Sequence, residues 1–185
     1  MSHLDMRNRI VALHGAGVLK RSALNIRGGA GVFERVLKGR GYRTVLEIGT
    51  YRGCAAAEMS RYVERVVTID LREGKLERMG ERFDRAEFWG SLGIQNIELL
   101  LVRDNAERKA VVDALDFDFA FIDGAHDASV REDFALVKHC GRVLFHDYDR
   151  RGDLEQDQVF NFVNSLPGAQ IEMMDIFALW KAPEC

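Results

Sequence analysis

Short apolar runs alternate with segments of helical spacing along most of the 185-residue chain. Such alternation predicts parallel strands that are joined by helical crossovers. The five runs lie at residues 44–48, 66–69, 97–102, 117–122 and 142–145. Two further runs, 170–174 and 177–181, are too close together for a crossover and predict an antiparallel hairpin. The predicted fold class is therefore α/β, with a doubly wound, mostly parallel seven-stranded sheet and a reversed C-terminal strand.

The spacing of apolar residues also predicts the helices that flank these strands. They are expected near residues 31–39, 54–63, 106–115 and 155–166. Leu76, Met79 and Phe83 mark a further, charged surface helix between the second and third strands. Ser129 and Glu132 form an S-x-x-E pattern, which predicts a capping box at the start of the helix after the fourth strand.

The net charge of −3 hides an asymmetry between the two ends of the chain. Up to Arg43 there are nine Lys and Arg residues and two acidic ones, whereas the rest carries 17 basic and 27 acidic residues. We therefore divide the chain into a basic, helical N-terminal extension (residues 1–42) and a main domain (residues 43–185). A basic segment suits an anionic substrate, an acidic partner or nucleic acid. The alternative is an extension laid on the acidic body of its own subunit, or on that of a neighbouring subunit in a homodimer.

Composition excludes several classes of protein. The sequence has no stretch of about 18 apolar residues, so we expect no membrane span. Its N-terminus lacks the uninterrupted apolar core of a secretory signal. Cys54, Cys140 and Cys185 show no C-x-x-C spacing, which indicates a reducing compartment and neither a disulfide framework nor a zinc site. We therefore expect a cytoplasmic protein.

Polar residues crowd the positions just after the predicted strands, where open α/β sheets bind their ligands. The first of these loops has the pattern E-x-G-x-x-x-G and contains Glu47, Gly49, Thr50, Tyr51 and Gly53. Its glycines let the backbone approach a ligand, and the helix after it offers free N–H groups. A dinucleotide fingerprint would have a glycine where Tyr51 stands. The carboxylate of Glu47 suits an ammonium group better than a phosphate.

Two more strand ends carry residues suited to a nucleoside. Asp70, followed by Leu71, ends the second strand, where an acidic residue can accept both hydroxyls of a ribose. Asp104 and Asn105 follow the third strand and are suited to hydrogen-bond an adenine edge. Each position has a second interpretation, because an Asp or Asn at a strand end also caps the helix that follows.

The sequence VLEIGTYRG followed by VVTID resembles the cofactor-binding half of class I S-adenosyl-L-methionine (SAM)-dependent methyltransferases. FDFAFIDGAHD and RVLFHDYD are similar to the second half of the small-molecule O-methyltransferases, a group that includes catechol O-methyltransferase and the macrolide-sugar methyltransferases. The resemblance covers residues 43–148 in order and spacing. It implies a Rossmann-like methyltransferase fold with SAM as the cofactor.

The resemblance also implies roles for the residues at the strand ends. Glu47 and Gly49, with the rest of the first loop, would line the methionine end of the cofactor. Asp70 would hold the ribose, and Asp104–Asn105 would flank the adenine. Asp123, after the fourth strand, would lie under the methionine part and beside a metal.

The sequence has a residue at the position of these families' catalytic base, but it matches only part of their metal site. His126 falls three residues after Asp123, where these families carry their catalytic base, so we expect it to take the acceptor's proton. Asp123 and Asp147 match two aspartate ligands of a Mg²⁺ site, and His146 is a third candidate. Tyr148 stands where catechol-type enzymes have an asparagine, which leaves metal binding open.

The sequence thus predicts SAM-dependent O-methylation of a small-molecule hydroxyl, with His126 as general base. One alternative is a non-catalytic SAM-binding partner module, because little sequence after the fifth strand is left to build a substrate lid. Another is a nucleic-acid methyltransferase that uses the basic N-terminus. The N/D-P-P-Y/F signature of amino-group methylation is absent and the acidic body would repel phosphates, so we expect a small-molecule acceptor.

Overall fold

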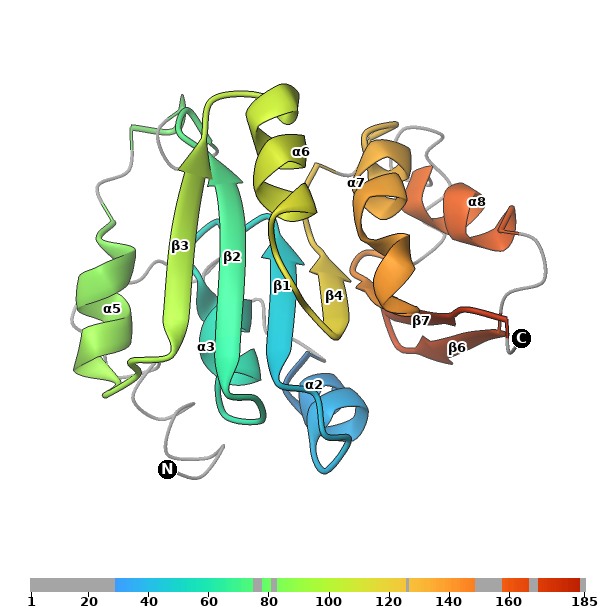
Figure 1. The fold of residues 1–185 in the computed structure, drawn as a ribbon, viewed down its shortest axis with the longest axis horizontal. Coiled ribbons are helices and arrows are strands. Elements are labelled where there is room, and N and C mark those ends of the chain that lie inside the picture. The colour runs from blue at the N-terminus through green and yellow to red at the C-terminus, as the bar shows by residue number, and fades with distance from the viewer. Residues whose placement is uncertain are drawn as a thin grey trace.

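The computed structural model describes residues 29–74, 78–80, 83–125, 127–148, 158–166 and 170–183. Within them, seven strands form one sheet in the order β3-β2-β1-β4-β5-β7-β6 (Figure 1). The strands are β1 (Thr44–Ile48), β2 (Arg65–Leu71), β3 (Ile97–Val102), β4 (Phe119–Ile122), β5 (Arg142–Phe145), β6 (Gln170–Met174) and β7 (Phe177–Lys181). Neighbours among β1 to β5 pair in parallel, and β7 runs antiparallel to β5 and β6. The predicted sheet with one reversed strand is confirmed.

Helices cover both faces of this sheet. They are α2 (Gly29–Leu37), α3 (Cys54–Met59), α5 (Arg85–Ser91), α6 (Asn105–Asp113), α7 (Val130–Val137), the short 3-10 helix η2 (Lys138–Cys140) and α8 (Gln158–Asn164). Buried residues of α2, α3 and α5 form a core cluster on one face, and those of α6, α7 and α8 form a second cluster on the other. Figure 1 shows α6 in front of the sheet and α3 behind it. This layering buries the parallel strands on both faces.

The two-residue period of β1 decides which face each of its side chains enters. Val45 belongs to the core cluster on the α2 and α3 face, whereas Leu46 and Ile48 belong to the cluster on the α6 and α7 face. Glu47 therefore projects toward the same face as Val45, and it is fully buried there. The first predicted site residue thus enters the core rather than solvent.

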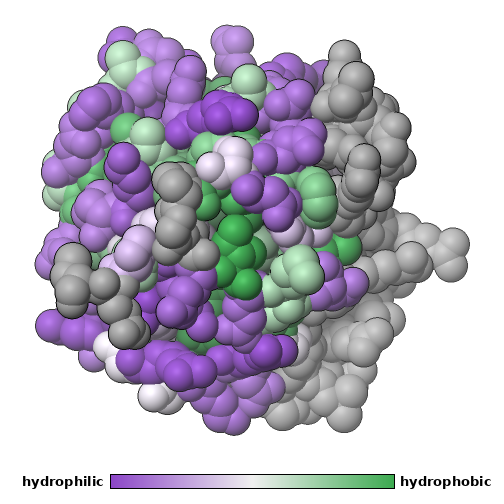
Figure 2. Space-filling view, turned by 90° about the vertical axis from the view of Figure 1, so that its right-hand side faces the viewer, coloured by the Kyte–Doolittle hydropathy of each residue, from purple (hydrophilic) through white to green (hydrophobic). Residues whose placement is uncertain are grey.

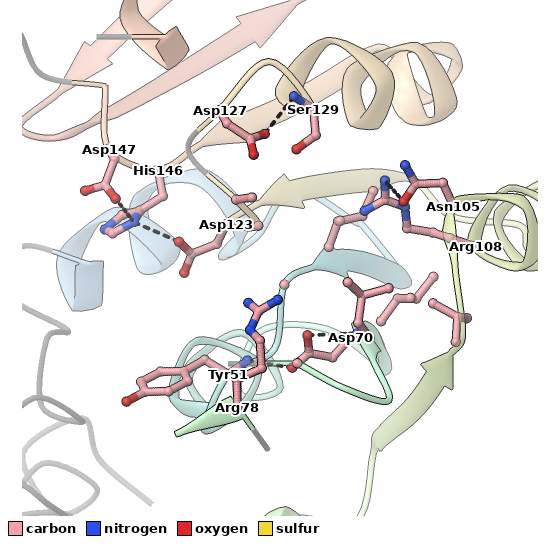
Figure 3. A pocket seen from close by; sticks show the side chains of 18 residues that line it. Tyr51, Asp70, Arg78, Asn105, Arg108, Asp123, Asp127, Ser129, His146 and Asp147 are labelled. Carbon is pink, nitrogen blue, oxygen red and sulfur yellow. Dashed lines mark hydrogen bonds and ion pairs between the residues drawn. The ribbon is translucent and has the colours of Figure 1, made fainter. Parts of the chain in front are cut away.

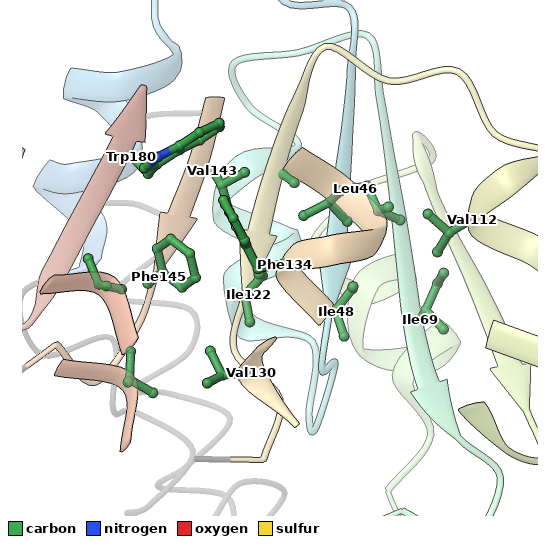
Figure 4. Packing of buried hydrophobic residues seen from close by; sticks show 14 of the residues in the cluster. Leu46, Ile48, Ile69, Val112, Ile122, Val130, Phe134, Val143, Phe145 and Trp180 are labelled. Carbon is green, nitrogen blue, oxygen red and sulfur yellow. The ribbon is translucent and has the colours of Figure 1, made fainter. Parts of the chain in front are cut away.

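Aromatic packing fixes α7 on the sheet (Figure 4). The ring of Phe134 lies 5.7 Å from that of Phe145 on β5 and meets Trp180 on β7 edge to face at 5.0 Å. Such contacts add to the burial of large apolar surfaces. The elements on both sides of the segment between β4 and α7 are therefore fixed on the sheet. This segment begins with Asp123, a predicted site residue.

Two local predictions are wrong, and one helix was missed. The missed helix is α5, which starts after Asp84. Of the predicted surface helix before it, Met79 is 55% exposed and Leu76 lies outside the described residues. Helix α3 ends at Met59 rather than near residue 63, and Ser60 bonds back to the carbonyl of Ala57. Ser129 makes no side-chain capping bond within the described chain, and its N–H is instead satisfied by Asp127 Oδ1 at 2.8 Å.

The predicted division at residue 43 cuts across a packed unit. Helix α2 belongs to the predicted extension, yet Phe33 and Leu37 are buried in the same cluster as Phe121 of β4. The ring of Phe33 meets that of Phe121 edge to face at 5.1 Å. Residues 1–28 lie outside the described residues, so the rest of the basic extension stays a prediction.

The surface seen from the side of β6 and β7 is largely hydrophilic, with a smaller hydrophobic area near its centre (Figure 2). Met173 on the edge strand β6 is 67% exposed. Among the described residues, no helix is both long enough and apolar enough to cross a membrane.

Candidate functional site

A pocket of about 700 Å³ opens at the carboxyl ends of the parallel strands (Figure 3). It lies where the strand order reverses between β1 and β4, the place at which open α/β sheets bind ligands. The predicted site residues on its wall are Gly49, Tyr51, Asp70, Leu71, Asn105, Asp123, His146 and Asp147. The chain's fold therefore brings residues from the ends of several strands into one cavity.

The remaining predicted residues have other positions. Glu47, Thr50 and Gly53 are buried and do not line the pocket. Asp104 is exposed at the start of α6, outside the pocket wall. His126, predicted as the general base, lies outside the residues that the structure describes.

Gly49 allows the loops after β1 and β4 to come into backbone contact. Its φ of +98° is in a region that glycine adopts far more readily than other residues. A Cβ atom at this position would lie 2.2 Å from the carbonyl oxygen of Asp123 and 2.7 Å from Cα of Gly124. Glycine is therefore required here because the two backbones touch.

Tyr51 holds an uncommon backbone conformation on the pocket wall, with a φ of 45°. Its N–H donates to Asp70 Oδ2 at 3.2 Å, and its carbonyl accepts from Arg85 Nε at 2.5 Å. Both backbone groups of this residue are thus fixed by side chains from other elements. Strained residues of this kind persist only where the surroundings hold them, and they cluster at functional sites.

Glu47 lies below the first loop in a network of threonines. Thr68 Oγ1 donates to Glu47 Oε2, and Thr50 Oγ1 lies 2.6 Å from Thr68 Oγ1. The other oxygen, Oε1, has no hydrogen-bond partner among the described residues. Burial raises the pKa of Glu47 well above its usual value, and the negative charges of Asp123 and Asp70 raise it further.

Asp70 is bound by two neighbouring elements at the end of β2. Its Oδ2 accepts from Tyr51 N–H and from Arg85 Nη2, the latter at 2.9 Å, and its Oδ1 accepts from the N–H of Leu71 at 2.9 Å. The Arg85 side chain is only 6% exposed. The predicted ribose acceptor is therefore present on the pocket wall as one half of a largely buried ion pair.

The sequence reasoning missed Arg85 and Trp89, which reach the first loop from α5. Trp89 Nε1 donates to the carbonyl of Gly53 at 2.9 Å, and a Cβ atom on Gly53 would lie 2.4 Å from the Trp89 ring. A local signal for α5 exists in the pair Asp84 and Glu87, because Asp84 Oδ1 accepts from the N–H of Glu87 as an N-cap. Nothing local indicates that α5 contacts the loop.

The start of α6 separates the two residues predicted to flank adenine. Asp104 is the N-cap, with its side chain accepting from Glu107 N–H at 2.9 Å. Asn105 faces the pocket, donating to Glu132 Oε2 at 3.0 Å and accepting from Arg108 Nη2 at 3.1 Å. The capping interpretation holds for Asp104, and Asn105 remains placed to meet a ligand.

A second ion pair, also missed by the sequence reasoning, connects α6 with α7 behind the pocket. Arg108 Nη2 lies 2.8 Å from Asp133 Oδ1, and the two side chains are 11% and 1% exposed. Asp133 Oδ2 would lie 3.3 Å from a Cβ atom on Gly124, so the pair lies against the loop that carries Asp123. Burial raises the pKa of Asp133 to about 6, although the charge of Arg108 opposes this shift.

The pKa of Asp133 gives folding stability a defined pH dependence. Because the folded pKa is about 6 and the ordinary value is 3.8, the folded state binds more protons between these two pH values. The contribution of Asp133 to the free energy of unfolding therefore falls by about 3 kcal/mol as pH rises through this window. We expect urea unfolding from pH 4 to 7 to show this extra fall in the wild type but not in Asp133→Asn. Parallel profiles of the two proteins would contradict this assignment.

His146 lies between the two carboxylates that were predicted as metal ligands (Figure 3). Its Nδ1 is 2.8 Å from Asp123 Oδ1 and 3.4 Å from Asp147 Oδ2. Burial lowers the pKa of His146, but its hydrogen bonds with Asp123 and Asp147 outweigh burial and raise this pKa to about 10. The two carboxylates therefore favour the protonated form of this imidazole.

The contacts of His146 with Asp123 and Asp147 occupy carboxylate oxygens that a divalent cation would need, which argues against a cation held by the three residues. Among the described residues, no group of three or more His, Cys, Asp or Glu side chains is placed to hold a metal ion. Tyr148, at the position of the missing asparagine, is buried and bonds through Oη to Asn164 on α8 at 3.1 Å. Its side chain is part of the core rather than the pocket.

Solved structures with this fold include methyltransferases. The O-methyltransferase TomG from Streptomyces achromogenes, in complex with SAM, is 19% identical over 84% of this chain and 80% of that chain (TM-score 0.63). The Bacillus cereus O-methyltransferase in complex with SAH is 15% identical over 96% and 91% (TM-score 0.66). An rRNA methylase from Streptococcus thermophilus is 16% identical over 84% and 95% (TM-score 0.55). No protein-family model and no curated protein matches the sequence. The chain has the fold of these methyltransferases.

Proposed function

We propose that this chain binds SAM in the pocket at the carboxyl edge of the sheet and transfers its methyl group to a hydroxyl of a small molecule. The observation that carries the proposal is the convergence of Asp70, Asn105 and the Gly49 loop on one cavity. The cavity of this chain lies at the reversal of the strand order, where open α/β sheets bind ligands. The chain also shares its fold with methyltransferases whose structures were solved with SAM or SAH.

The polar groups of the site suit the parts of this cofactor. Asp70 supplies carboxylate oxygens for ribose hydroxyls, and Asn105 supplies an amide for a purine edge. Glu47 does not line the pocket, so its buried carboxyl would affect the ligand only through Thr68, Thr50 and the first loop. When bound, SAM would supply a methyl group on a sulfonium centre, and the acceptor oxygen would bond to the methyl carbon in line as the carbon–sulfur bond breaks and the neutral thioether leaves.

The chain's own task in this reaction is to orient the acceptor and remove its proton. His126 is the proposed general base, and Asp123 provides negative charge on the wall beside the reacting centre. Divalent metal assistance is the part of the prediction that the pairing of His146 argues against. We expect methyl transfer to continue in excess EDTA. A loss of activity that Mg²⁺ restores would contradict this expectation.

Calorimetry with S-adenosylhomocysteine (SAH), the demethylated product, tests the binding half of the proposal. The wild type should bind SAH, and Asp70→Ala should weaken binding by about tenfold or more, because it loses hydrogen bonds from a charged group on the pocket wall. Glu47→Gln should weaken binding less, because Glu47 supports the first loop without lining the pocket. No binding by the wild type, or unchanged binding by both variants, would overturn the proposal.

Asp104→Ala separates the helix cap from the cofactor site. Loss of the cap should lower the free energy of unfolding by about 1 kcal/mol. SAH affinity should change by less than about twofold, because Asp104 does not line the pocket. Asn105→Ala is the comparison, since this residue faces the cavity and should weaken SAH binding. A large loss of SAH affinity in Asp104→Ala would restore its predicted contact with adenine.

Transfer of a labelled methyl group to a panel of small hydroxyl compounds tests the catalytic half. Once an acceptor is found, His126→Ala should lower turnover by about 10²- to 10⁴-fold, the usual contribution of a general base. His139→Ala is the control, because its ring packs against Phe117 outside the pocket. Unchanged turnover in His126→Ala would exclude this residue as the base.

A nucleic-acid acceptor is the second candidate. The excess of nine basic over two acidic residues up to Arg43 favours it, and the fold includes an rRNA methylase. Methyl transfer to RNA that falls steeply with salt would support this candidate. Transfer to a small hydroxyl compound, with no salt-dependent binding of RNA, would support the first.

A further inference from the structure

Helix α5 reaches the first loop with two long side chains, one turn apart. Arg85 donates from Nε to the Tyr51 carbonyl and from Nη2 to Asp70 Oδ2. Trp89 donates to the Gly53 carbonyl. The two contacts act on different atoms, because Arg85 reaches a ligand-facing carboxylate and Trp89 reaches only the loop backbone. Arg85 therefore has a position from which it can affect recognition as well as loop shape.

The contacts of Arg85 close a small ring of hydrogen bonds. Tyr51 N–H donates to Asp70 Oδ2, Arg85 Nη2 donates to the same oxygen, and Arg85 Nε donates to the Tyr51 carbonyl. Rotation of the Asp70 carboxylate would break two of these bonds together. Charge-assisted bonds from a planar guanidinium fix the direction of a carboxylate more strictly than a single donor does.

Burial strengthens this effect. The side chains of Arg85 and Asp70 are 6% and 14% exposed, so water competes little for their contact. The charge of Arg85 also opposes the rise in the pKa of Glu47 that Asp70 contributes to. Arg85 thus offsets the crowding of carboxylates beneath the first loop.

We infer that Arg85 is a positioning residue for ribose recognition, which fixes the Asp70 carboxylate and the Tyr51 backbone in the orientation that receives the ribose hydroxyls. This inference rests on the proposed binding of SAM. It gives α5 a role in ligand selectivity, although the sequence analysis predicted site residues only at the ends of strands. It also distinguishes Arg85 from Trp89, which shapes the loop without touching Asp70.

Calorimetry with two ligands tests the inference. The ligands are SAH and an analogue of SAH that lacks both ribose hydroxyls. The wild type should prefer SAH, and Arg85→Met should weaken SAH binding by about tenfold while changing analogue binding by less than about twofold. Arg85→Lys should recover part of the preference, because it keeps a charged donor but loses the second bond. Trp89→Phe is the matched control and should weaken both ligands alike.

The outcomes separate the inference from the proposed function. If Arg85→Met lost affinity for both ligands equally, or for neither, the positioning role would be overturned. The proposed function would still stand, provided that the wild type binds SAH. Failure of the wild type to bind SAH would overturn the proposed function itself. Should Arg85→Met not fold, Asp70→Asn supplies the second background. Adding Arg85→Met to Asp70→Asn should leave the ratio of the affinities for SAH and for the analogue unchanged. A further change in that ratio would contradict the inference.

Discussion

Gly49→Ala is expected to lower the free energy of unfolding by about 3 kcal/mol or more and to abolish SAH binding. Two effects add at this position. A φ of +98° is unfavourable for any residue with a Cβ atom, and that atom would lie 2.2 Å from the backbone oxygen of Asp123. Backbone cannot move aside as a flexible side chain can, so the loops after β1 and β4 must separate. Chemical denaturation and SAH calorimetry measure the two losses.

Gly41→Ala is the matched control for this experiment. Its φ of +78° is also positive, but no described atom lies within 4 Å of a Cβ atom built there. The cost of the backbone conformation alone should therefore be about 1 kcal/mol. If Gly49→Ala proves as stable as Gly41→Ala, the close contact of the two loops is wrong.

Arg108→Met is expected to cost about 3–5 kcal/mol, because it leaves the carboxylate of Asp133 buried without its partner. Asp133 is 1% exposed and Arg108 lies on the pocket wall, so the loss should reach both stability and ligand binding. Urea unfolding at pH 7 measures the first. At pH 5, where Asp133 is mostly protonated, the penalty should be smaller.

The double variant Arg108→Met with Asp133→Asn is the control, since it removes both charges. Replacing both members of a buried pair costs far less than removing one of them. Most of the lost stability should therefore return in the double variant. A double variant as unstable as Arg108→Met would show that Arg108 acts through packing or through its bond with Asn105, and not through Asp133.

The strands were predictable because their signal is local. Strands β6 and β7 lie at the predicted residues, since apolar runs bounded by polar residues leave little choice of register. Helix α5 was missed by the sequence reasoning. In the structure, its start depends on the cap at Asp84 and on tertiary contacts that no local pattern reports.

The site was predictable where its residues follow strands and not where they lie within helices. The position of Asp70 at the carboxyl end of β2 put it on the pocket wall, because parallel strands end at one edge of the sheet. Arg85, Arg108 and Asp133 lie within helices, and each meets its partner only through the folded chain. His146 was a candidate metal ligand from its place alone, and its contact with Asp123 argues against that role.

A crystal structure of the protein with SAH tests the central claim most directly. The ligand should lie in the pocket between Tyr51 and Asn105, with its ribose hydroxyls on the carboxylate of Asp70. The homocysteine end should point toward Asp123 and His146. A ligand bound away from Asp70, or a pocket that stays empty at saturating SAH, would contradict the assignment of this edge of the sheet as a SAM site.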